Sequence, residues 1–521
     1  MSKLCRELTI LPWGAATTLE SMSTTTAHHT DTLIIGAGIS GIGMACRLRQ
    51  EFPDRDFAIL ERRNAIGGTW DLFRYPGIRS DSDMFTFGYD FRPWDELNVL
   101  ADGASIRSYV TDTAKEFGVD ERIKYGVKVL AADWSSADQA WTVTALREAT
   151  GDTEIWTCSF LVTATGYYNH DEGYLPEFPG SDTFQGTQIH PQHWPEDLDY
   201  TGKKVVIIGS GATAITLVPA MAEAAEHVTM LQRSPSYIFS LPAKDKITAF
   251  QRRFLPRSVS YKLTRARNIA TARAIFKTAR RFPGPVRSLL LGQVKKQVGD
   301  GVDMAHFSPT YGPWDQRLCA CPDGDFFNVL RDGTASIVTD TIETFTPTGI
   351  KLTSGQELEA DIIITATGLA VQLLGGATLT MDGEPVDASA RCTYKGVMLE
   401  GVPNLMWVFG YTNLSWTTKV GLTSSYLVRL FKHMDAAGTT VVVPEGAGDQ
   451  ATDDMFLADK AAELSSGYLQ RGAHLLPRQG RGFPWRTVQD YRHDKKALLS
   501  DPIDDGVLTF EAARAKESVS A

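Results

Sequence analysis

The sequence predicts an α/β fold with two doubly wound parallel-sheet domains and a helical insertion. A glycine-rich turn at residues 36–41 stands between an apolar run and a helix-like segment, and the same arrangement recurs at residues 209–214. Two further apolar runs end in the same tripeptide, Ala-Thr-Gly, at residues 164–166 and 366–368. Short apolar runs bounded by glycine are typical of buried parallel strands. The repetition therefore indicates two copies of one architecture, the second inserted into the first.

Composition narrows the class of protein. The chain has 521 residues, of which 43% are apolar and 22% charged, as in an ordinary soluble globular protein of several domains. A net charge of −10 argues against a nucleic-acid partner. The six cysteines lack a CxxC pair and disulfide-framework spacing, so we expect reduced thiols and a cytoplasmic protein. No apolar run reaches the roughly 18 residues that a membrane-spanning helix needs.

The first glycine-rich turn has the spacing of a Rossmann-like dinucleotide-binding domain. The apolar run Thr32–Ile35 precedes it, and a second strand over residues 56–60 ends at Glu61. Glycines at this spacing permit a tight turn and let backbone N–H groups approach a pyrophosphate at a helix N-terminus. An acid about 20 residues further on accepts hydrogen bonds from an adenosine ribose. The predicted cofactor-binding residues of this turn are Gly36, Gly38, Ser40, Gly41 and Glu61.

The second glycine-rich turn differs at the end of its second strand. Arg233 and Ser234 stand where the first site has an acid. A carboxylate would repel a 2′-phosphate, whereas Arg can pair with it bidentately. The sequence thus predicts FAD at the first turn and NADPH at the second, although Arg233 could also be a solvated surface residue. The predicted cofactor-binding residues here are Gly209, Gly211, Ala212, Thr213, Arg233 and Ser234.

Two longer motifs resemble those of a known family. The segment 184–195 has the spacing FxGxxxHxxxWP, and residues 67–81 read GGTWDLFRYPGIRSD. Both resemble the fingerprints of the Baeyer–Villiger monooxygenases, and Trp194 separates them from flavin N/S-monooxygenases, which usually have Tyr or Phe there. The runs IHPQHWPEDLDY and ADIIITATGL narrow the resemblance to the ethionamide-activating monooxygenases, over about residues 31–510.

The resemblance implies a reaction. It implies bound FAD, consumption of NADPH and O2, and conversion of ketones to esters or lactones through a flavin peroxide, with sulfides and thioamides as further substrates. Arg317 matches the family's active-site arginine and Asp81 the acid that orients it, so these are the candidate catalytic residues. Arg stays charged at any working pH, and one donor directed at an oxyanion is worth about 3 kcal/mol. The alternative interpretation of Arg317 is a structural ion pair under a loop.

The resemblance assigns further roles. Gln316 stands where many relatives have a Lys that helps to hold the 2′-phosphate, which would weaken the preference for NADPH. Trp485 weakly matches a late tryptophan that covers the nicotinamide, and residues 411–416 are candidates for lining the substrate pocket. The matching cofactor-binding residues are Gly68, Thr69, Trp70 and Asp81. The residues expected to couple the two domains are Phe184, Gly186, His190 and Trp194.

Two alternatives to this function stay open at this point. One is a flavin N/S-monooxygenase without ketone activity, and the other is a non-catalytic nucleotide-binding redox sensor, against which Arg317, Asp81 and both turns argue. A metal site has little support, because Cys319 and Cys321 form a CxC without a second pair. The physiological substrate and the oligomeric state are not determined by the sequence.

Residues 246–299 contain 14 Lys or Arg and no Asp or Glu. Prolines at 256, 283 and 285 divide this segment into several predicted helices. It could be a solvated helical face, it could attract anionic NADPH, or it could rest on anionic lipid as a peripheral membrane contact.

The motifs also predict domain boundaries. A flexible leader is expected over 1–30, the FAD-binding domain over 31–172 and 369–500, and the NADPH-binding domain over 173–368, with its helical insertion at about 240–312. A C-terminal tail follows at 501–521.

Overall fold

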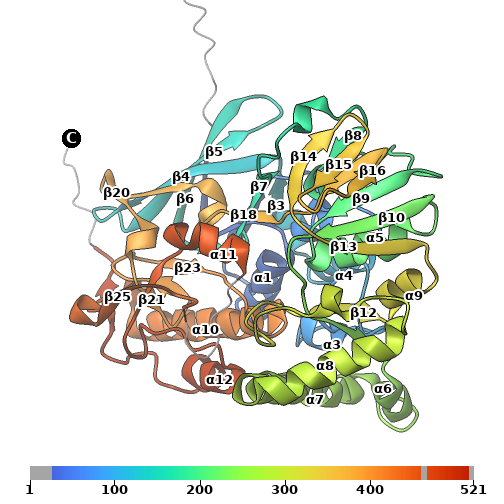
Figure 1. Ribbon diagram of the computed structural model, residues 1–521. Helices are drawn as coiled ribbons and strands as arrows, with labels where there is room; N and C mark the ends of the chain where they lie inside the picture. Colours follow the sequence, from blue (N-terminus) through green and yellow to red (C-terminus); the bar gives the residue numbers. More distant parts are fainter. Residues whose placement is uncertain (1–25, 459–465, 515–521) are drawn as a thin grey trace, which may run out of the picture.

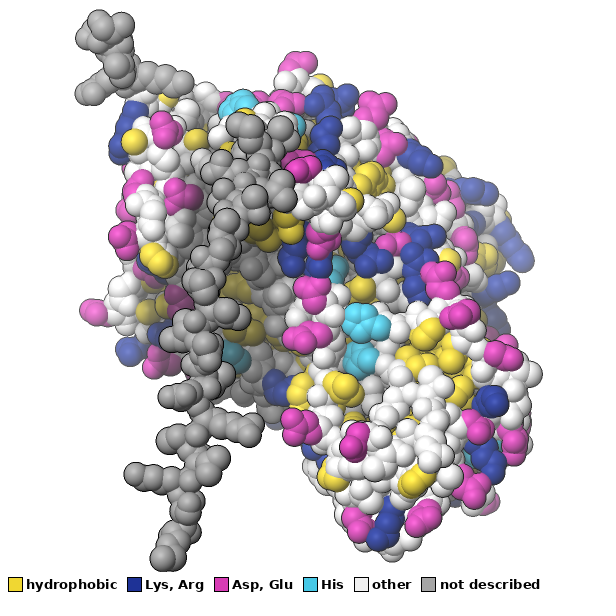
Figure 2. Space-filling model, turned by 90° about the horizontal axis from the view of Figure 1, so that it is seen from above, with side chains coloured by type: hydrophobic (Ala, Val, Ile, Leu, Met, Phe, Trp, Pro, Cys, Tyr) yellow, Lys and Arg dark blue, Asp and Glu magenta, His cyan; other side chains and the backbone are white. Residues whose placement is uncertain are grey.

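The computed structural model describes residues 26–458 and 466–514 of the chain. Figure 1 shows two α/β lobes side by side, with helices α6, α7 and α8 lying together along the bottom edge of the view. Seen from above in Figure 2, acidic and basic side chains are interspersed over the surface. Within the described residues, no helix has the length and apolar character needed to cross a membrane.

A nine-stranded sheet forms the first lobe. Its order is β20-β19-β4-β5-β6-β1-β2-β3, with β23 also paired to β6. Strands β6, β1, β2 and β3 are parallel neighbours, and they are covered by helices α1 (Ile39–Glu51), α4 (Gly103–Glu116) and α10 (Trp416–Ala437). The strands are β1 (Thr26–Ile35), β2 (Phe57–Glu61), β3 (Ile123–Tyr125), β4 (Val127–Ser135), β5 (Ala140–Arg147), β6 (Asp152–Thr163), β19 (Thr378–Met381), β20 (Glu384–Val386) and β23 (Leu405–Trp407).

The second lobe has a five-stranded parallel sheet of order β13-β10-β9-β17-β8. Helices α5 (Ala212–Met221) and α9 (Asp325–Arg331) pack on it. The strands are β8 (Thr187–Ile189), β9 (Lys204–Ile208), β10 (His227–Gln232), β13 (Ala335–Thr339) and β17 (Ile362–Thr365). Because both faces of such a sheet are covered, its strands are continuous apolar runs. The predicted α/β fold with two doubly wound domains is confirmed.

Two short strand pairs connect these sheets to the site. The chain passes between the lobes in β7 (Tyr168–Gly173) and returns in β18 (Leu369–Val371), and these two segments pair antiparallel. In the second lobe, β11 (Ile238–Leu241) pairs in parallel with β12 (Cys319–Pro322). The loop just before β12 carries Arg317.

The basic segment forms three helices, α6 (Lys246–Gln251), α7 (Arg257–Arg281) and α8 (Pro283–Val298). The breaks fall at the predicted prolines, because proline lacks an N–H and fits only at the first turn of a helix. Helix α7 packs on α3 (Met84–Phe87) of the first lobe, and α8 packs on α9 of the second. The helical insertion therefore packs against both lobes.

The expected leader is too long at its C-terminal end. Strand β1 begins at Thr26, and residues 26–30 pair with residues 154–158 of β6. His28 stacks on Trp156, with ring centroids 4.2 Å apart, so ladder hydrogen bonds and an aromatic contact order these polar residues. Residues 1–25 lie outside the described residues.

Part of the expected C-terminal tail is also ordered, since β27 (Leu508–Ala512) pairs with β24 (Thr439–Pro444). The other domain boundaries stay predictions.

Candidate functional site

A cavity of about 1020 Å³ opens between the two glycine-rich turns. This volume is at the upper end of the roughly 300–1,000 Å³ usual for small-molecule sites. The cavity brings together most of the predicted site residues from both lobes. Those lining it are Gly36, Gly38, Ser40, Glu61, Gly68, Thr69, Trp70, Asp81, Gly209, Gly211, Ala212, Thr213, Arg233, Ser234 and Arg317.

The two glycine-rich turns are built alike. Gly36 has φ +103°, and a Cβ there would lie 2.8 Å from the carbonyl oxygen of Ala164. Gly209 has φ +141°, and its Cβ would lie 2.3 Å from the carbonyl oxygen of Ala366. Only glycine fits such a conformation and approach. Each Ala-Thr-Gly segment therefore presses its alanine carbonyl on the first glycine of one turn, which explains why the tripeptide occurs twice. Gly41 does not line the cavity but packs on the backbone of Gly36.

Glu61 ends β2 at the wall of the cavity. Its carboxylate accepts hydrogen bonds from the backbone N–H of Ala37 at 2.6 Å and of Arg63 at 2.8 Å. Burial raises the pKa of Glu61, and these two hydrogen bonds oppose the rise. The carboxylate is thereby fixed beside the first turn, in the place where an acid can accept from a ribose hydroxyl.

The segment with Gly68, Thr69 and Trp70 closes over the first turn. Gly67 and Gly38 form an isolated parallel bridge, and helix α2 (Thr69–Leu72) starts directly behind Gly68. Asp71 is buried and accepts from Arg63 at 2.7 Å and Arg107 at 2.9 Å. These ion pairs tie α2 to the segment after β2 and to α4, while the backbone N–H of Gly67 donates to the carbonyl oxygen of Ala37 in the first turn.

Arg317 faces the cavity and is held by Asp81. The guanidinium Nη2 donates to Asp81 Oδ1 at 2.8 Å, and the side chains are 44% and 23% exposed. Asp81 raises the pKa of Arg317, so the guanidinium is a permanent cation. The preceding loop is supported by helix α7, because Phe276 packs edge-on against Trp314 and Arg280 pairs with Asp315.

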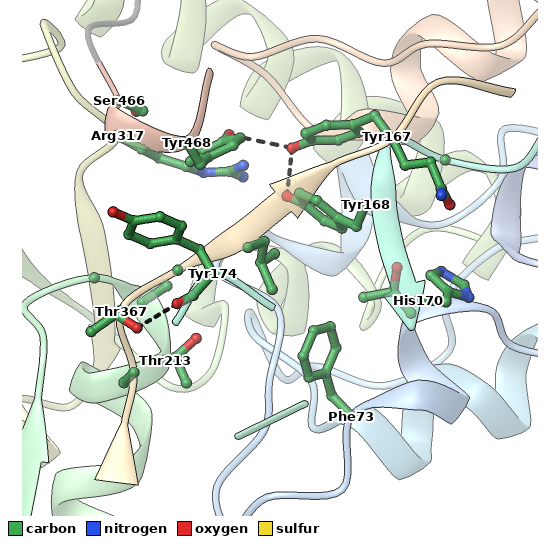
Figure 3. A pocket seen from close by; sticks show the side chains of 18 of the residues that line it. Phe73, Tyr167, Tyr168, His170, Tyr174, Thr213, Arg317, Thr367, Ser466 and Tyr468 are labelled. Atoms are coloured by element: carbon green, nitrogen blue, oxygen red, sulfur yellow. Dashed lines mark hydrogen bonds between the residues drawn. The ribbon is translucent and has the colours of Figure 1, made fainter. Parts of the chain in front are cut away.

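Three tyrosines surround the guanidinium, and we did not predict them. The hydroxyl of Tyr167 lies 2.5 Å from that of Tyr168 and 3.4 Å from that of Tyr468. Figure 3 shows Arg317 lying beneath Tyr468 and pointing toward these hydroxyls. Burial raises the pKa of Tyr167 and Tyr168, so both stay protonated donors. The position of Tyr167 directly after the first Ala-Thr-Gly was the available signal; nothing local marks Tyr468.

A second arginine near Arg233 was also missed. Arg471, on α11 (Gly467–Gly472), lines the cavity and stacks on Tyr174, with its guanidinium 3.5 Å from the ring centroid. Burial and the neighbouring Arg233 lower the pKa of Arg471. Two cations so close together indicate a place for an anion. Gln316 lines the same cavity.

The linker residues lie behind the cavity rather than in its wall. Phe184 is buried in the second lobe, and Trp194 packs against that lobe's core. His190 Nε2 lies 3.3 Å from the carbonyl oxygen of Gly368, just before β18, and burial lowers the pKa of His190. Gly186 packs on Phe184 and Asp361. Of these residues, His190 contacts the residue before the strand that returns to the first lobe, and the coupling role of the linker stays a prediction.

The two further candidates from the sequence have different outcomes. Tyr411 and Trp416 line the cavity, and Trp416 Nε1 donates to Ser40 Oγ at 2.8 Å. Trp485 is buried against Tyr394, with ring centroids 5.9 Å apart, and does not line the cavity. The weak match of Trp485 to a nicotinamide-covering residue is therefore wrong, because its indole fills the core of the first lobe.

Comparisons with known proteins agree with this architecture. A solved structure described as oxidized steroid monooxygenase bound to NADP superposes with a TM-score of 0.74 at 22% identity, over 93% of this chain and 100% of that chain. The two lobes with facing glycine-rich turns thus share the fold of that structure. Residues 30–254 match the model of the flavin-binding monooxygenase-like family.

Sequence relatives define the family more closely. The chain is 59% identical over 491 residues to the putative FAD-containing monooxygenase MymA of Mycobacterium tuberculosis, covering 93% of this chain and 98% of the relative. It is 49% identical over 485 residues to the FAD-containing monooxygenase EthA of the same species, covering 93% and 98%. The chain belongs to the FAD-containing monooxygenases. The prediction of an FAD-dependent monooxygenase is confirmed.

Proposed function

We propose that this protein is a Baeyer–Villiger monooxygenase that uses FAD, NADPH and O2 to convert ketones to esters or lactones. The observation that carries the proposal is the Arg317 guanidinium, held at 2.8 Å by Asp81 in the cavity that both glycine-rich turns line. The structural neighbour with bound NADP has the same two-lobed fold, which supports a nicotinamide dinucleotide at the second turn.

The residues of the first turn suit FAD. The approach of Gly36 to Ala164 and the bridge between Gly38 and Gly67 shape the turn that leads into α1. The N-terminus of α1 lies at the cavity wall, which favours a pyrophosphate. Glu61 is placed to accept from the ribose. When bound, FAD supplies the redox and oxygen-activating chemistry, with NADPH as the source of hydride.

The residues of the second turn suit NADPH. Gly209, Gly211 and the N-terminus of α5 form the phosphate cradle, while Arg233 and Ser234 follow β10 at the cavity wall. In sequence β10 is followed directly by Arg233 rather than by an acid, and Arg233 could pair with a 2′-phosphate.

Arg317 would stabilise the negative charge that develops on reacting oxygens. A fixed guanidinium costs no reorganisation during the reaction, and a donor of this kind is worth about 3 kcal/mol, or on the order of a hundredfold in rate. Asp81 orients it and offsets the cost of an isolated charge. The hydroxyls of Tyr167 and Tyr468 supply further donors beside it.

Sulfides and thioamides are proposed as additional substrates, because an electron-rich sulfur can take oxygen in the same cavity. The ethionamide-activating type is a narrower proposal, supported by 49% identity to EthA, although identity to MymA is higher at 59%. A cytoplasmic location is proposed as well; five described cysteines are buried free thiols, which fits a reducing compartment.

Product analysis tests the proposal. The FAD-loaded protein is incubated with NADPH, isotopically labelled O2 and a panel of linear and cyclic ketones beside a sulfide. We expect esters or lactones that carry the label. Arg317→Ala should still bind FAD and be reduced by NADPH but should lose ester formation by on the order of a hundredfold.

Other outcomes contradict parts of the proposal. Sulfoxide without any ester would favour a flavin N/S-monooxygenase. Absence of NADPH oxidation by the FAD-loaded protein would favour a nucleotide-binding sensor. Normal ester yield from Arg317→Ala would remove this residue from its role. Arg122→Ala, which breaks the ion pair with Asp56 outside the cavity, controls for loss of a structural ion pair.

A further inference from the structure

Exposed apolar side chains are concentrated on the helical insertion. Eight of the twelve large hydrophobic side chains that are exposed in the described part of the chain lie between residues 247 and 289. Single exposed apolar residues are normal, but a concentration of them marks an interaction surface. The eight are Ile247, Phe250, Phe254, Val259, Leu263, Ile275, Phe282 and Leu289.

Helix α7 exposes a stripe of apolar residues to solvent. Residues 259, 263, 266, 270 and 274 recur at helical spacing; all are Val, Leu or Ala, and all are exposed. Arginines on other sides of the helix bind inward, next to its buried residues Ser260, Tyr261, Thr264, Ile269 and Ala279. Arg265 donates to the carbonyl oxygens of Phe85, Thr86 and Gly88, and Arg273 pairs with Asp490 at 2.7 Å. An ordinary surface helix keeps its apolar stripe toward the core and polar residues outside, so the apolar stripe that α7 exposes is unusual.

The most exposed aromatic residues lie beside the start of α7. Phe250 at the end of α6 is 60% exposed and Phe254 in the following turn is 72% exposed. Their rings pack edge to face, with centroids 5.3 Å apart, and Ile247 is 58% exposed one turn earlier. Together with the outward face of α7, these residues form the apolar part of what we call the insertion face (residues 246–282).

The charge of the insertion face has one sign. It includes the exposed cations Lys246, Arg253, Arg257, Lys262 and Arg281, and within residues 26–458 and 466–514 none of these has a carboxylate partner within 4.0 Å. The sequence has no acid from residue 246 to residue 299, whereas acidic and basic side chains are interspersed on the face seen in Figure 2.

We propose that the insertion face docks on an anionic lipid surface. Apolar side chains beside cations are the pattern of helices that lie in a membrane interface, and each Lys or Arg near anionic headgroups adds to the attraction. A second copy of the chain fits less well, because a self-complementary contact would bring the same unpaired cations together.

The proposed docking would bring the catalytic loop close to lipid. Phe276 and Arg280 of α7 support the Arg317 loop through Trp314 and Asp315, from a face of the helix other than the exposed one. An enzyme docked in this way would meet apolar substrates dissolved in the bilayer.

Co-sedimentation of the FAD-loaded full chain with vesicles tests this surface. Phosphatidylglycerol–phosphatidylcholine vesicles are compared with pure phosphatidylcholine at about 0.05 M and 1 M salt, since the screening length falls to about 3 Å at 1 M. Two variants probe the face: Phe250→Ser with Phe254→Ser, and Arg253→Gln with Lys262→Gln. Leu130→Ser and Lys124→Gln are matched controls on exposed positions of the first lobe.

We expect the wild type and both controls to sediment with anionic vesicles at low salt only. The partition coefficient of the charge variant onto anionic vesicles should be about thirtyfold lower, because the variant lacks two cations that would each attract the anionic surface by about 1 kcal/mol. The phenylalanine variant should also lose binding. Unchanged FAD content and unchanged oxidation of a water-soluble substrate show that the variants fold.

Three results would overturn the proposal. They are no sedimentation of the wild type at low salt, equal sedimentation with neutral vesicles, and full binding by both variants. Sedimentation velocity could give a fourth such result. If the wild type is a dimer and the phenylalanine variant is a monomer, the insertion face binds a second copy of the chain instead of lipid.

Discussion

Arg317 and Asp81 stand 236 positions apart in the chain, yet Arg317 Nη2 donates to Asp81 Oδ1 at 2.8 Å. Asp81 belongs to the first lobe, after the segment that closes over the first glycine-rich turn, whereas Arg317 precedes β12 in the second lobe. The ion pair therefore joins the two lobes at the cavity. Any change in the relative position of the lobes would alter where the guanidinium points.

Asp81→Asn tests this orientation. We expect flavin reduction by NADPH to persist and ester formation to fall by roughly tenfold, because the amide keeps the shape but no longer fixes the guanidinium through a charge-assisted hydrogen bond. Rapid-reaction absorbance separates the two steps. In a double-mutant cycle with Arg317→Ala, additive losses would show that the residues act independently.

Gly36→Ala and Gly209→Ala should each impair the binding of a different cofactor. A methyl group at Gly36 would meet Ala164 and one at Gly209 would meet Ala366, so each change distorts one turn. We expect Gly36→Ala to lower FAD content and Gly209→Ala to keep FAD but weaken NADP⁺ binding, measured by absorbance and calorimetry. Gly292→Ala, at a helical position with open space, is the control. Loss of FAD from Gly209→Ala would contradict the assignment.

Arg471→Ala should weaken NADP⁺ binding by roughly tenfold, the usual worth of a hydrogen bond to a charged group. The reason is that Arg471, on α11, lines the same cavity as Arg233, and burial and the nearby charge of Arg233 lower the pKa of Arg471. Comparing NADPH with NADH shows which phosphate it meets: an equal loss indicates the pyrophosphate, and a loss for NADPH alone the 2′-phosphate. Unchanged constants for both would exclude Arg471.

His170→Gln should reduce the acid sensitivity of the apoprotein. Burial, with help from Arg63 and Arg62, lowers the pKa of His170 from 6.5 to about 4. Between pH 6.5 and about 4, this histidine is protonated in the unfolded chain but neutral in the folded protein. The free energy of unfolding therefore falls as the pH drops from 6.5 toward 4, and it falls no further from this group below pH 4. Between pH 7 and about pH 4.5, the variant should lose about 2 kcal/mol less than wild type in denaturant unfolding. His193→Gln, at an exposed histidine, should behave like wild type.

The sequence predicted the parts of the site that depend on local backbone geometry. The turns at Gly36 and Gly209 and the acid at Glu61 follow from spacing, because a strand, a tight turn and a helix place N–H groups in one way. The prediction that Trp485 covers the nicotinamide was wrong, since a tryptophan near the C-terminus can equally fill a hydrophobic core. Tyr468 and Arg471 had no local signal, because they reach the cavity through a distant segment that folds back on it.

The chain by itself determined two nucleotide-binding turns, their different second-strand ends and the family of monooxygenases, all properties of residues close together in sequence. Only the tertiary structure decided that both turns face one cavity, that Tyr167, Tyr168 and Tyr468 surround Arg317, and that α7 exposes an apolar stripe to solvent. These depend on how separate segments pack, and packing selects among the many arrangements that the same local patterns allow.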